Sequence, residues 1–347
     1  MTEAESLPEA STTEVTVRRA RSVDVEAVAV FTADTWGDRH EDYLPRVFAD
    51  WVASDDDTQR TFVATITPTD LVTTADARGV DDDIVVTGDG SGAAAAGEPE
   101  AVVGCVQGVL LSEWESWAQG IRVNPAARGL GVGSQLSEAV LDWARASGAT
   151  VCRNMVFSWN VAGLGQSRAV GFDPGTEFRF ARPDPDAAPE TAPGTAVEDP
   201  DPDAAWAFWS RSDARDHLGG LGLDPRESWS CSQVTRDRLS TAADDGRLIV
   251  VRDEEVAGFA AHTRVWEHET ADDSVARHAI YGTAAWRDAT AAGALLDTVA
   301  HDAAARDADS ARVFIPETVE SVSDVAINRV DVSDEPDFVM SADLTDR

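Results

Sequence analysis

The chain repeats itself once on the scale of a whole domain, and this duplication limits the folds it can adopt. Residues 278–299 align with residues 119–140 without a gap, and 311–317 resemble the strand pattern of 150–157. The copies are about 160 residues apart, which is much longer than a solenoid repeat and typical of a domain. The 347 residues therefore predict two domains of one fold.

Strand and helix patterns alternate along the first copy and predict an α/β fold with a mixed sheet. Residues 101–111 read as a buried strand, and 133–148 carry apolar residues at helical spacing up to Gly148. The full predicted order is strand 15–20, helices 22–36 and 41–54, strands 60–66, 101–111 and 113–123, helix 133–148, strand 150–157, helix 160–172 and strand 176–182.

Changes in composition predict the domain boundaries. Residues 1–14 are polar and acidic, and we expect them to be disordered. The first domain then covers 15–182, and its acidic, Gly/Ala-rich stretch 67–99 reads as an inserted surface loop. Residues 183–194 are rich in proline and acid and predict a linker, so that 195–347 form the second domain.

The charge of the chain excludes one large class of partners. All 28 basic residues are arginine, against 63 acidic residues, which gives a net charge of −35. Such a lysine-free, acidic composition resembles that of proteins from salt-loving microbes, in which carboxylates keep the surface hydrated. The chain lacks the basic surface that nucleic-acid binding requires. Because concentrated salt screens charge, the acidity is not evidence for a cationic substrate.

No segment of the sequence predicts export or membrane insertion. The N-terminus has no hydrophobic run, and no apolar stretch approaches the length of a membrane span. Cys105, Cys152 and Cys231 have no CxxC spacing and predict buried thiols in a reducing compartment. The histidines show no metal-ligand spacing, so we expect no metal. These features predict a cytoplasmic monomer or homodimer that binds neither membranes nor nucleic acid.

Residues 124–133, NPAARGLGVG, connect a predicted strand to a predicted helix and suggest a phosphate site. The first N–H groups of a helix have no partner within it and carry partial positive charge, and glycines let a phosphate approach the backbone. Arg128 can add a guanidinium. A P-loop would need a lysine after its last glycine, and a dinucleotide fingerprint would need GxGxxG, whereas the spacing here is GxGxG.

The run from Val123 to Gly133 resembles the acyl-CoA-binding signature of the GNAT superfamily of N-acetyltransferases, Val-x-Pro-x-x-Arg-Gly-x-Gly-x-Gly/Ala. The order of elements around it is similar to that family's order, as is the helix that begins at Asn160 and closes with Gly171-Phe172. The resemblance is good over 15–182 and weak over 195–347. It implies two tandem GNAT-like domains, each a mostly antiparallel central sheet flanked by helices, with one parallel strand pair that splays apart.

The resemblance also implies roles for particular residues. Acetyl-CoA would be the co-substrate, and an amine would attack its thioester directly, with no covalent enzyme intermediate. The main chain of Ile121 and Val123 would pair with the pantetheine arm, Asn160 would lie beside it, and an N–H near Val123 would stabilise the thioester oxygen. The pyrophosphate would be bound by the amides of Arg128, Gly129, Leu130, Gly131, Val132, Gly133 and Ser134.

The catalytic and acceptor residues are expected from position. Because side chains alternate between the two faces of a strand, Glu113 and Glu115 share one face of strand 113–123. Glu115 is the best-placed carboxylate on that face for a general base, followed by Glu113. Ser167 stands where the family often has a tyrosine that protonates the leaving thiolate. The loop between the first two helices borders the acceptor site in this family, which suggests Trp36, His40 and Tyr43 as acceptor-site residues.

The second copy has lost the signature. Arg287 falls on Arg128, but Asp288, Thr290 and Ala292 replace the three glycines, so this copy is not expected to bind CoA through that turn. The leading hypothesis is an N-acetyltransferase acting on a primary amine of a small molecule or peptide. Because Ser167 is a poor proton donor, a non-catalytic acyl-CoA-binding or regulatory protein is the alternative.

Overall fold

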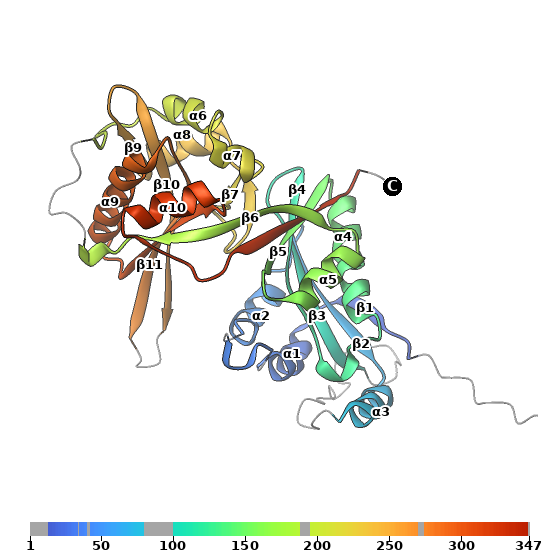
Figure 1. Ribbon diagram of the computed structural model, residues 1–347. Helices are drawn as coiled ribbons and strands as arrows, with labels where there is room; N and C mark the ends of the chain where they lie inside the picture. Colours follow the sequence, from blue (N-terminus) through green and yellow to red (C-terminus); the bar gives the residue numbers. More distant parts are fainter. Residues whose placement is uncertain are drawn as a thin grey trace, which may run out of the picture. The chain divides into compact units, whose positions relative to one another are not determined.

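The computed structural model describes residues 13–33, 35–39, 42–79, 100–187, 195–269 and 274–345 (Figure 1). These residues divide into two compact units. The first contains the described residues up to Cys152 and those from Asp343 onward, and the second runs from Arg153 to Ala342. His40 and the middle of the predicted insertion lie outside the described residues.

The first unit is built on four strands that pair antiparallel in chain order. The long central strand is buried from Ala101 to Val109, as expected for a strand covered on both faces. The strands are β1 (Thr16–Arg19), β2 (Gln59–Ile66), β3 (Ala101–Leu110) and β4 (Glu115–Val123).

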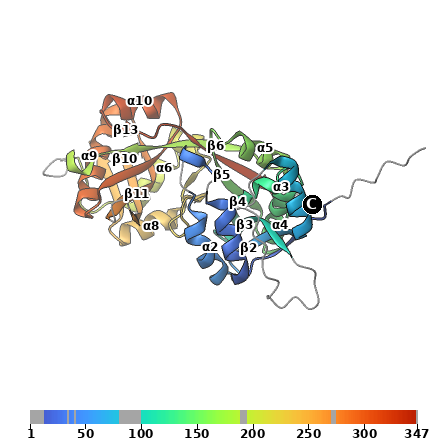
Figure 2. The same ribbon diagram turned by 90° about the horizontal axis from the view of Figure 1, so that it is seen from below.

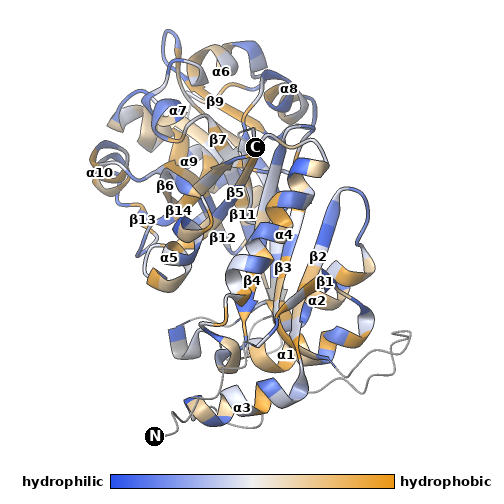
Figure 3. Cartoon of the chain, turned by 90° about the vertical axis from the view of Figure 1, so that its right-hand side faces the viewer, coloured by the Kyte–Doolittle hydropathy of each residue, from blue (hydrophilic) through white to orange (hydrophobic). Residues whose placement is uncertain are grey.

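Helices cover the two faces of this sheet. On one face, α1 (Val25–Thr32) and α2 (Leu44–Ala53) bury residues such as Phe31 and Phe48 against the strands. The short helices η1 (Ser22–Asp24) and η2 (Gly37–Arg39) precede α1 and α2 in the chain. On the other face α4 (Val132–Ala146), which follows η4 (Pro125–Ala127), packs so closely that a Cβ on Gly104 would lie 2.8 Å from Val132 Cγ1. Figure 3 shows α4 with both hydrophobic and hydrophilic residues along its length, as expected for a helix with one buried face.

A helix, α3 (Pro68–Arg78), occupies the first part of the stretch predicted to be a loop. That part of the loop prediction was wrong, because composition concealed good local helix signals. The Thr67 side chain accepts a hydrogen bond from the Asp70 N–H at 3.1 Å, and proline follows at the first helical position. Leu71 and Ala75, one turn apart, are buried, and Gly79 ends the helix in the left-handed region.

The second unit is a sheet in which β11 (Val275–Trp286) and β12 (Ser310–Pro316) run parallel and the other registered pairs are antiparallel. This combination confirms the mixed α/β class. β5 (Val151–Phe157) begins in the first unit and ends in the second. The other strands are β6 (Asp173–Arg182), β7 (Leu221–Leu223), β8 (Cys231–Gln233), β9 (Leu248–Arg252), β10 (Val256–Glu269), β13 (Asp331–Val332) and β14 (Asp337–Asp343).

The core of the second unit lies beneath α9 (Ala289–Ala305), whose Leu295, Leu296 and Val299 are buried against β11 and β12. α9 and α10 (Val319–Ile327) lie side by side (Figure 2). The other helices are α5 (Val161–Ala169), η5 (Pro185–Ala187), α6 (Pro202–Trp209), α7 (Asp213–His217) and α8 (Arg236–Asp244). Within the described ranges, no helix is both long and apolar enough to cross a membrane.

The compact units do not coincide with the two sequence copies. β6 belongs to the first copy, yet its backbone pairs with β12 and β14, which belong to the second. Since main-chain groups of a buried strand need partners, these ladders tie β6 to the second unit. The division at 183–194 therefore stays a prediction about the duplicated sequence, whereas the contacts divide the chain at Cys152.

Candidate functional site

The glycine-rich turn before α4 leaves the start of that helix open. Gly129 and Gly131 have φ values of 78° and 81°, in the left-handed region that glycine favours. Gly131 is the N-cap residue, and no side chain caps the helix. Of the described residues, only the Gln135 side chain would come within 4 Å of a Cβ on Gly131, at 3.8 Å, so these residues leave space beside the turn.

Several N–H groups at this turn and the start of α4 have no acceptor in the described part of the chain. Those of Gly129, Gly131, Val132 and Ser134 donate no hydrogen bond to any residue that the structure describes. Together with the helix dipole, such N–H groups form a site for a phosphate or another anion. The residues therefore fit the pyrophosphate of an acyl-CoA.

The matching turn before α9 is closed by the protein itself. The Asp288 carboxylate accepts hydrogen bonds from the N–H groups of Thr290 at 3.0 Å and Ala291 at 2.9 Å. The hydrogen bond from Ala291 and the neighbouring Arg287 lower the pKa of Asp288. Arg287 also pairs with Asp253, at 2.9 Å. A carboxylate thus occupies the position at which a phosphate would bind this helix.

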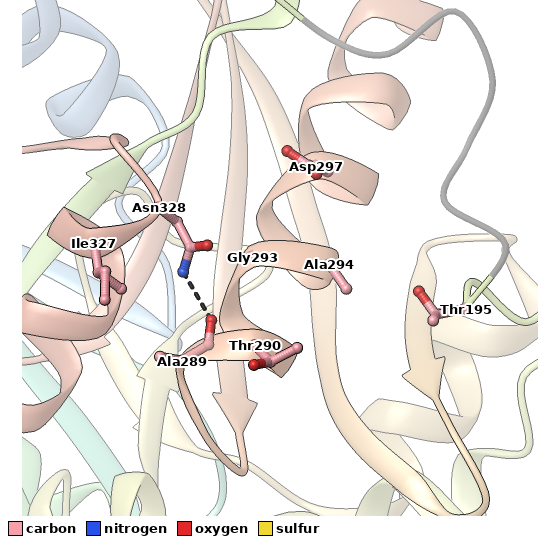
Figure 4. A pocket seen from close by; sticks show the side chains of 8 residues that line it. All are labelled: Thr195, Ala289, Thr290, Gly293, Ala294, Asp297, Ile327 and Asn328. Atoms are coloured by element: carbon pink, nitrogen blue, oxygen red, sulfur yellow. Dashed lines mark hydrogen bonds between the residues drawn. The ribbon is translucent and has the colours of Figure 1, made fainter.

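A pocket of about 560 Å³ lies beside the start of α9, in the second unit (Figure 4). The Asn328 side chain points across it and donates a hydrogen bond to the Ala289 carbonyl at 2.8 Å. Among the described residues that line it, Asp297 is the only charged one. The pocket therefore offers no cation to a phosphate group.

Strand β4 contains a bulge that alternation alone did not predict. Cys105 of β3 lies opposite Arg122, but Gln107 lies opposite Gln119, so β4 has one extra residue between them. Gly120 lies in this bulge with a φ of 64°. A Cβ there would lie 2.5 Å from the Trp51 ring, so only glycine fits.

The bulge corrects the predicted face of this strand. Unbroken alternation along 113–123 placed Gln119 and Val123 on one face. The extra residue reverses the alternation beyond it, so Arg122 shares the face of Gln119 while Val123 lies on the α4 face. A glycine inside a strand often marks a bulge, and Gly120 was the signal that could have revealed it.

Two of the predicted acceptor residues meet around Arg122. Its guanidinium carbon lies 4.6 Å from the centre of the Trp36 ring and 5.8 Å from that of Tyr43. Asp42 completes the cluster, with its Oδ2 2.7 Å from Arg122 Nε. Sequence reasoning missed Arg122 and Asp42, because nothing in the pattern links residues 80 positions apart.

Glu115 lies apart from that cluster, at the beginning of β4. It is 3 % exposed, and its Oε2 accepts a hydrogen bond from the Ser112 hydroxyl at 3.2 Å. The strand from Glu115 to Val123 has nine residues, and the eight steps between them span roughly 26 Å in an extended strand. The structure does not bring the predicted base to the end of the strand that leads into the glycine turn.

Asn160 and Ser167 belong to the second unit. The Asn160 side chain caps α5 by accepting a hydrogen bond from the Gly163 N–H at 3.0 Å. Ser167 is 2 % exposed, and its hydroxyl accepts a hydrogen bond from the Asn154 amide at 3.1 Å. Asn154 is a further polar residue beside the position of the expected proton donor, and no sequence pattern indicated it.

Comparison with known proteins agrees with the turn geometry. Residues 68–165 match the Acetyltransferase (GNAT) family, which confirms the resemblance carried by residues 123–133. This segment includes β3, β4, the glycine turn and α4. No curated protein sequence matches the chain.

Solved structures share the fold at low sequence identity. A GCN5-related N-acetyltransferase from Sphaerobacter thermophilus is 14% identical, with a TM-score of 0.56 over 95% of this chain and 96% of that one. A tandem GNAT protein from the clavulanic acid biosynthesis pathway is 12% identical, with a TM-score of 0.51 over 96% and 100%. A fungal glucosamine N-acetyltransferase region is 14% identical, with a TM-score of 0.53 over 95% of this chain and 38% of that one.

Proposed function

We propose that this chain, which carries a GNAT-family segment at residues 68–165, is an acetyl-CoA-dependent N-acetyltransferase. It transfers an acetyl group to a primary amine of a small molecule or peptide. The observation that carries the proposal is the uncapped start of α4 behind two left-handed glycines. The start of α4 can accept a phosphate, whereas the Asp288 side chain caps the start of α9, the matching helix of the second copy.

The first copy supplies the residues that bind the co-substrate. The turn from Arg128 to Ser134 binds the pyrophosphate through those of its N–H groups that donate to no described residue, and the phosphate meets partial positive charge there. The main chain of Ile121 and Val123 pairs with the pantetheine arm. Asn160 contributes by fixing the first turn of α5, through its hydrogen bond to Gly163.

Acetyl-CoA, when bound, supplies an acetyl thioester that an unprotonated amine attacks directly. The N–H near Val123 stabilises the thioester oxygen as negative charge develops. Trp36, His40 and Tyr43 are the proposed acceptor residues. Glu115 is the candidate base from sequence, but it lies at the opposite end of β4 from Val123. Direct attack by the amine needs no cysteine nucleophile. Burial also raises the pKa of the Cys105 thiol to about 12, which disfavours its reactive thiolate.

A second candidate is a protein that binds acyl-CoA without turning it over. One observation favours it: Ser167 is only 2 % exposed, so its hydroxyl is poorly placed to reach a thiolate and protonate it. Direct attack does not require this proton donor, since a CoA thiolate leaves readily. We therefore propose acetyl transfer as the function and acyl-CoA binding without turnover as the alternative.

Thiol release separates the two candidates. The full-length protein is incubated with acetyl-CoA and a panel of primary amines, and free CoA is measured with a thiol reagent. The panel includes glucosamine, because one structural relative is described as a glucosamine N-acetyltransferase region. Amine-dependent thiol release is expected. If acetyl-CoA binds but no amine stimulates thiol release, the protein is a non-catalytic acyl-CoA-binding protein and the acetyltransferase proposal fails.

The cellular setting is also a proposal. A cytoplasmic enzyme, monomeric or homodimeric, agrees with three buried cysteines that form no disulfide. Its partners would be acetyl-CoA and the amine acceptor, without a metal, a nucleic acid or a membrane.

A further inference from the structure

Helix α3 packs beside the glycine turn. Its contacts are with η4, the short helix immediately before Arg128. Leu71 and Ala75 hold α3 in place because both are fully buried on one helical face. Arg78 is the last residue of this helix and lies at the end that reaches the turn.

The Arg78 side chain lies directly over the turn. Its Nη2 is 3.4 Å from the position that a Cβ on Gly129 would occupy. The side chain is exposed, so it is accessible to a ligand. Neither Arg78 nor Arg128 forms an ion pair with a residue in the described part of the chain.

The matching position in the second copy shows the difference. Arg287, which aligns with Arg128, forms ion pairs with Asp253 and Asp288. The chain has 63 acidic residues, yet neither Arg78 nor Arg128 pairs with a carboxylate of the described part of the chain. At the start of α4 the Arg78 guanidinium lies beside Gly129, next to N–H groups that donate to no residue that the structure describes.

We infer that Arg78 is a further binding residue, whose guanidinium holds a phosphate group of CoA. The inference rests on the proposed function, and it gives the inserted helix α3 a role at that site. A guanidinium binds phosphate through paired, charge-assisted hydrogen bonds. Such bonds persist at salt concentrations that screen long-range attraction, which suits a chain with a net charge of −35.

Calorimetric titration of the full-length protein with CoA tests the inference. Arg78→Met keeps the length of the side chain and removes its charge, and we expect binding to weaken roughly tenfold. Arg78→Lys is expected to recover only part of the loss, because a lysine cannot pair in a bidentate manner. Arg215→Met, at a half-exposed arginine of α7, is the matched control and should leave binding unchanged.

A second titration with 3′-dephospho-CoA identifies the phosphate. If Arg78→Met weakens CoA and dephospho-CoA equally, Arg78 binds the pyrophosphate; if it weakens CoA alone, Arg78 binds the 3′-phosphate. Either result supports the inference. Equal affinity of the wild type and Arg78→Met for CoA would overturn it. A wild type that binds no CoA at all would instead refute the proposed function.

Discussion

Arg122 and Asp42 form a buried ion pair, in which Nε lies 2.7 Å from Oδ2 and the Asp42 side chain has 0% exposure. Asp42 also accepts a hydrogen bond from the Leu44 N–H at 3.0 Å, at the beginning of α2. The pair therefore fixes the loop that carries Trp36 and Tyr43 against β4. The surface pair of Arg145 and Asp142 has the same 2.7 Å separation, but its aspartate side chain is 74% exposed.

Breaking the buried pair should be far more costly than breaking the exposed one. We expect Asp42→Ala to lower the free energy of unfolding by about 3–5 kcal/mol, because it leaves the Arg122 charge buried without a partner. Asp142→Ala should cost about 0.5 kcal/mol or less. Urea titrations of both variants give the comparison, and equal losses would refute this account of the cluster.

The charge of the turn can be tested apart from its shape. Gly131→Asp and Gly131→Asn introduce side chains of similar size that tolerate the left-handed region. We expect Asn to weaken CoA binding several-fold and Asp to abolish it, because only Asp opposes the phosphate charge. Thr290→Asp is the matched control, since Thr290 aligns with Gly131 and is exposed. A loss of CoA binding in that control would mean that the second copy binds CoA after all.

His262 should make the second unit sensitive to acid. Burial, followed by the nearby Arg306 charge, lowers the pKa of His262 to about 4. Between pH 6.5 and 4 the unfolded chain therefore binds a proton that the folded chain does not, so stability is complete above pH 6.5 and falls as the pH decreases. The loss approaches about 3 kcal/mol at pH 4. His262→Leu should reduce the pH dependence of the free energy of unfolding, measured by urea titrations between pH 6.5 and 4. An unchanged pH dependence would contradict the role given to His262.

Glu115→Gln tests the candidate base. Direct proton transfer requires hydrogen-bond reach, or one intervening water. Because Glu115 lies roughly 26 Å along the strand from Val123, we expect kcat with the best amine to fall less than threefold. A hundredfold fall, together with loss of the acidic limb of the pH profile, would establish Glu115 as the base.

Local signals in the sequence predicted much of the candidate site. The strand, the glycine turn and the helix were all visible, because glycine conformations and helical spacing act over a few residues. The cap at Asn160 and the loss of glycines before α9 were visible for the same reason.

Long-range pairing was not predictable in this way. The bulge at Gly120 depends on the Trp51 ring beneath it, and the contacts around Arg122 join segments 80 residues apart. The assignment of β6 to the second unit depends on ladders formed with β12 and β14. Such features arise from tertiary packing, which a single sequence does not display.

The Asp288 cap has a consequence for how cofactor and stability are linked. A carboxylate attached to the chain fills the start of α9 at every concentration of acetyl-CoA, whereas the start of α4 is filled only when a ligand arrives. Ligand binding raises the free energy of unfolding by RT ln(1 + L/Kd), where L is the free ligand concentration, a gain that grows with the logarithm of that concentration once it exceeds Kd. The first copy should therefore become more heat-resistant as acetyl-CoA accumulates, while α9 keeps a permanent internal substitute for the anion and gains nothing from it.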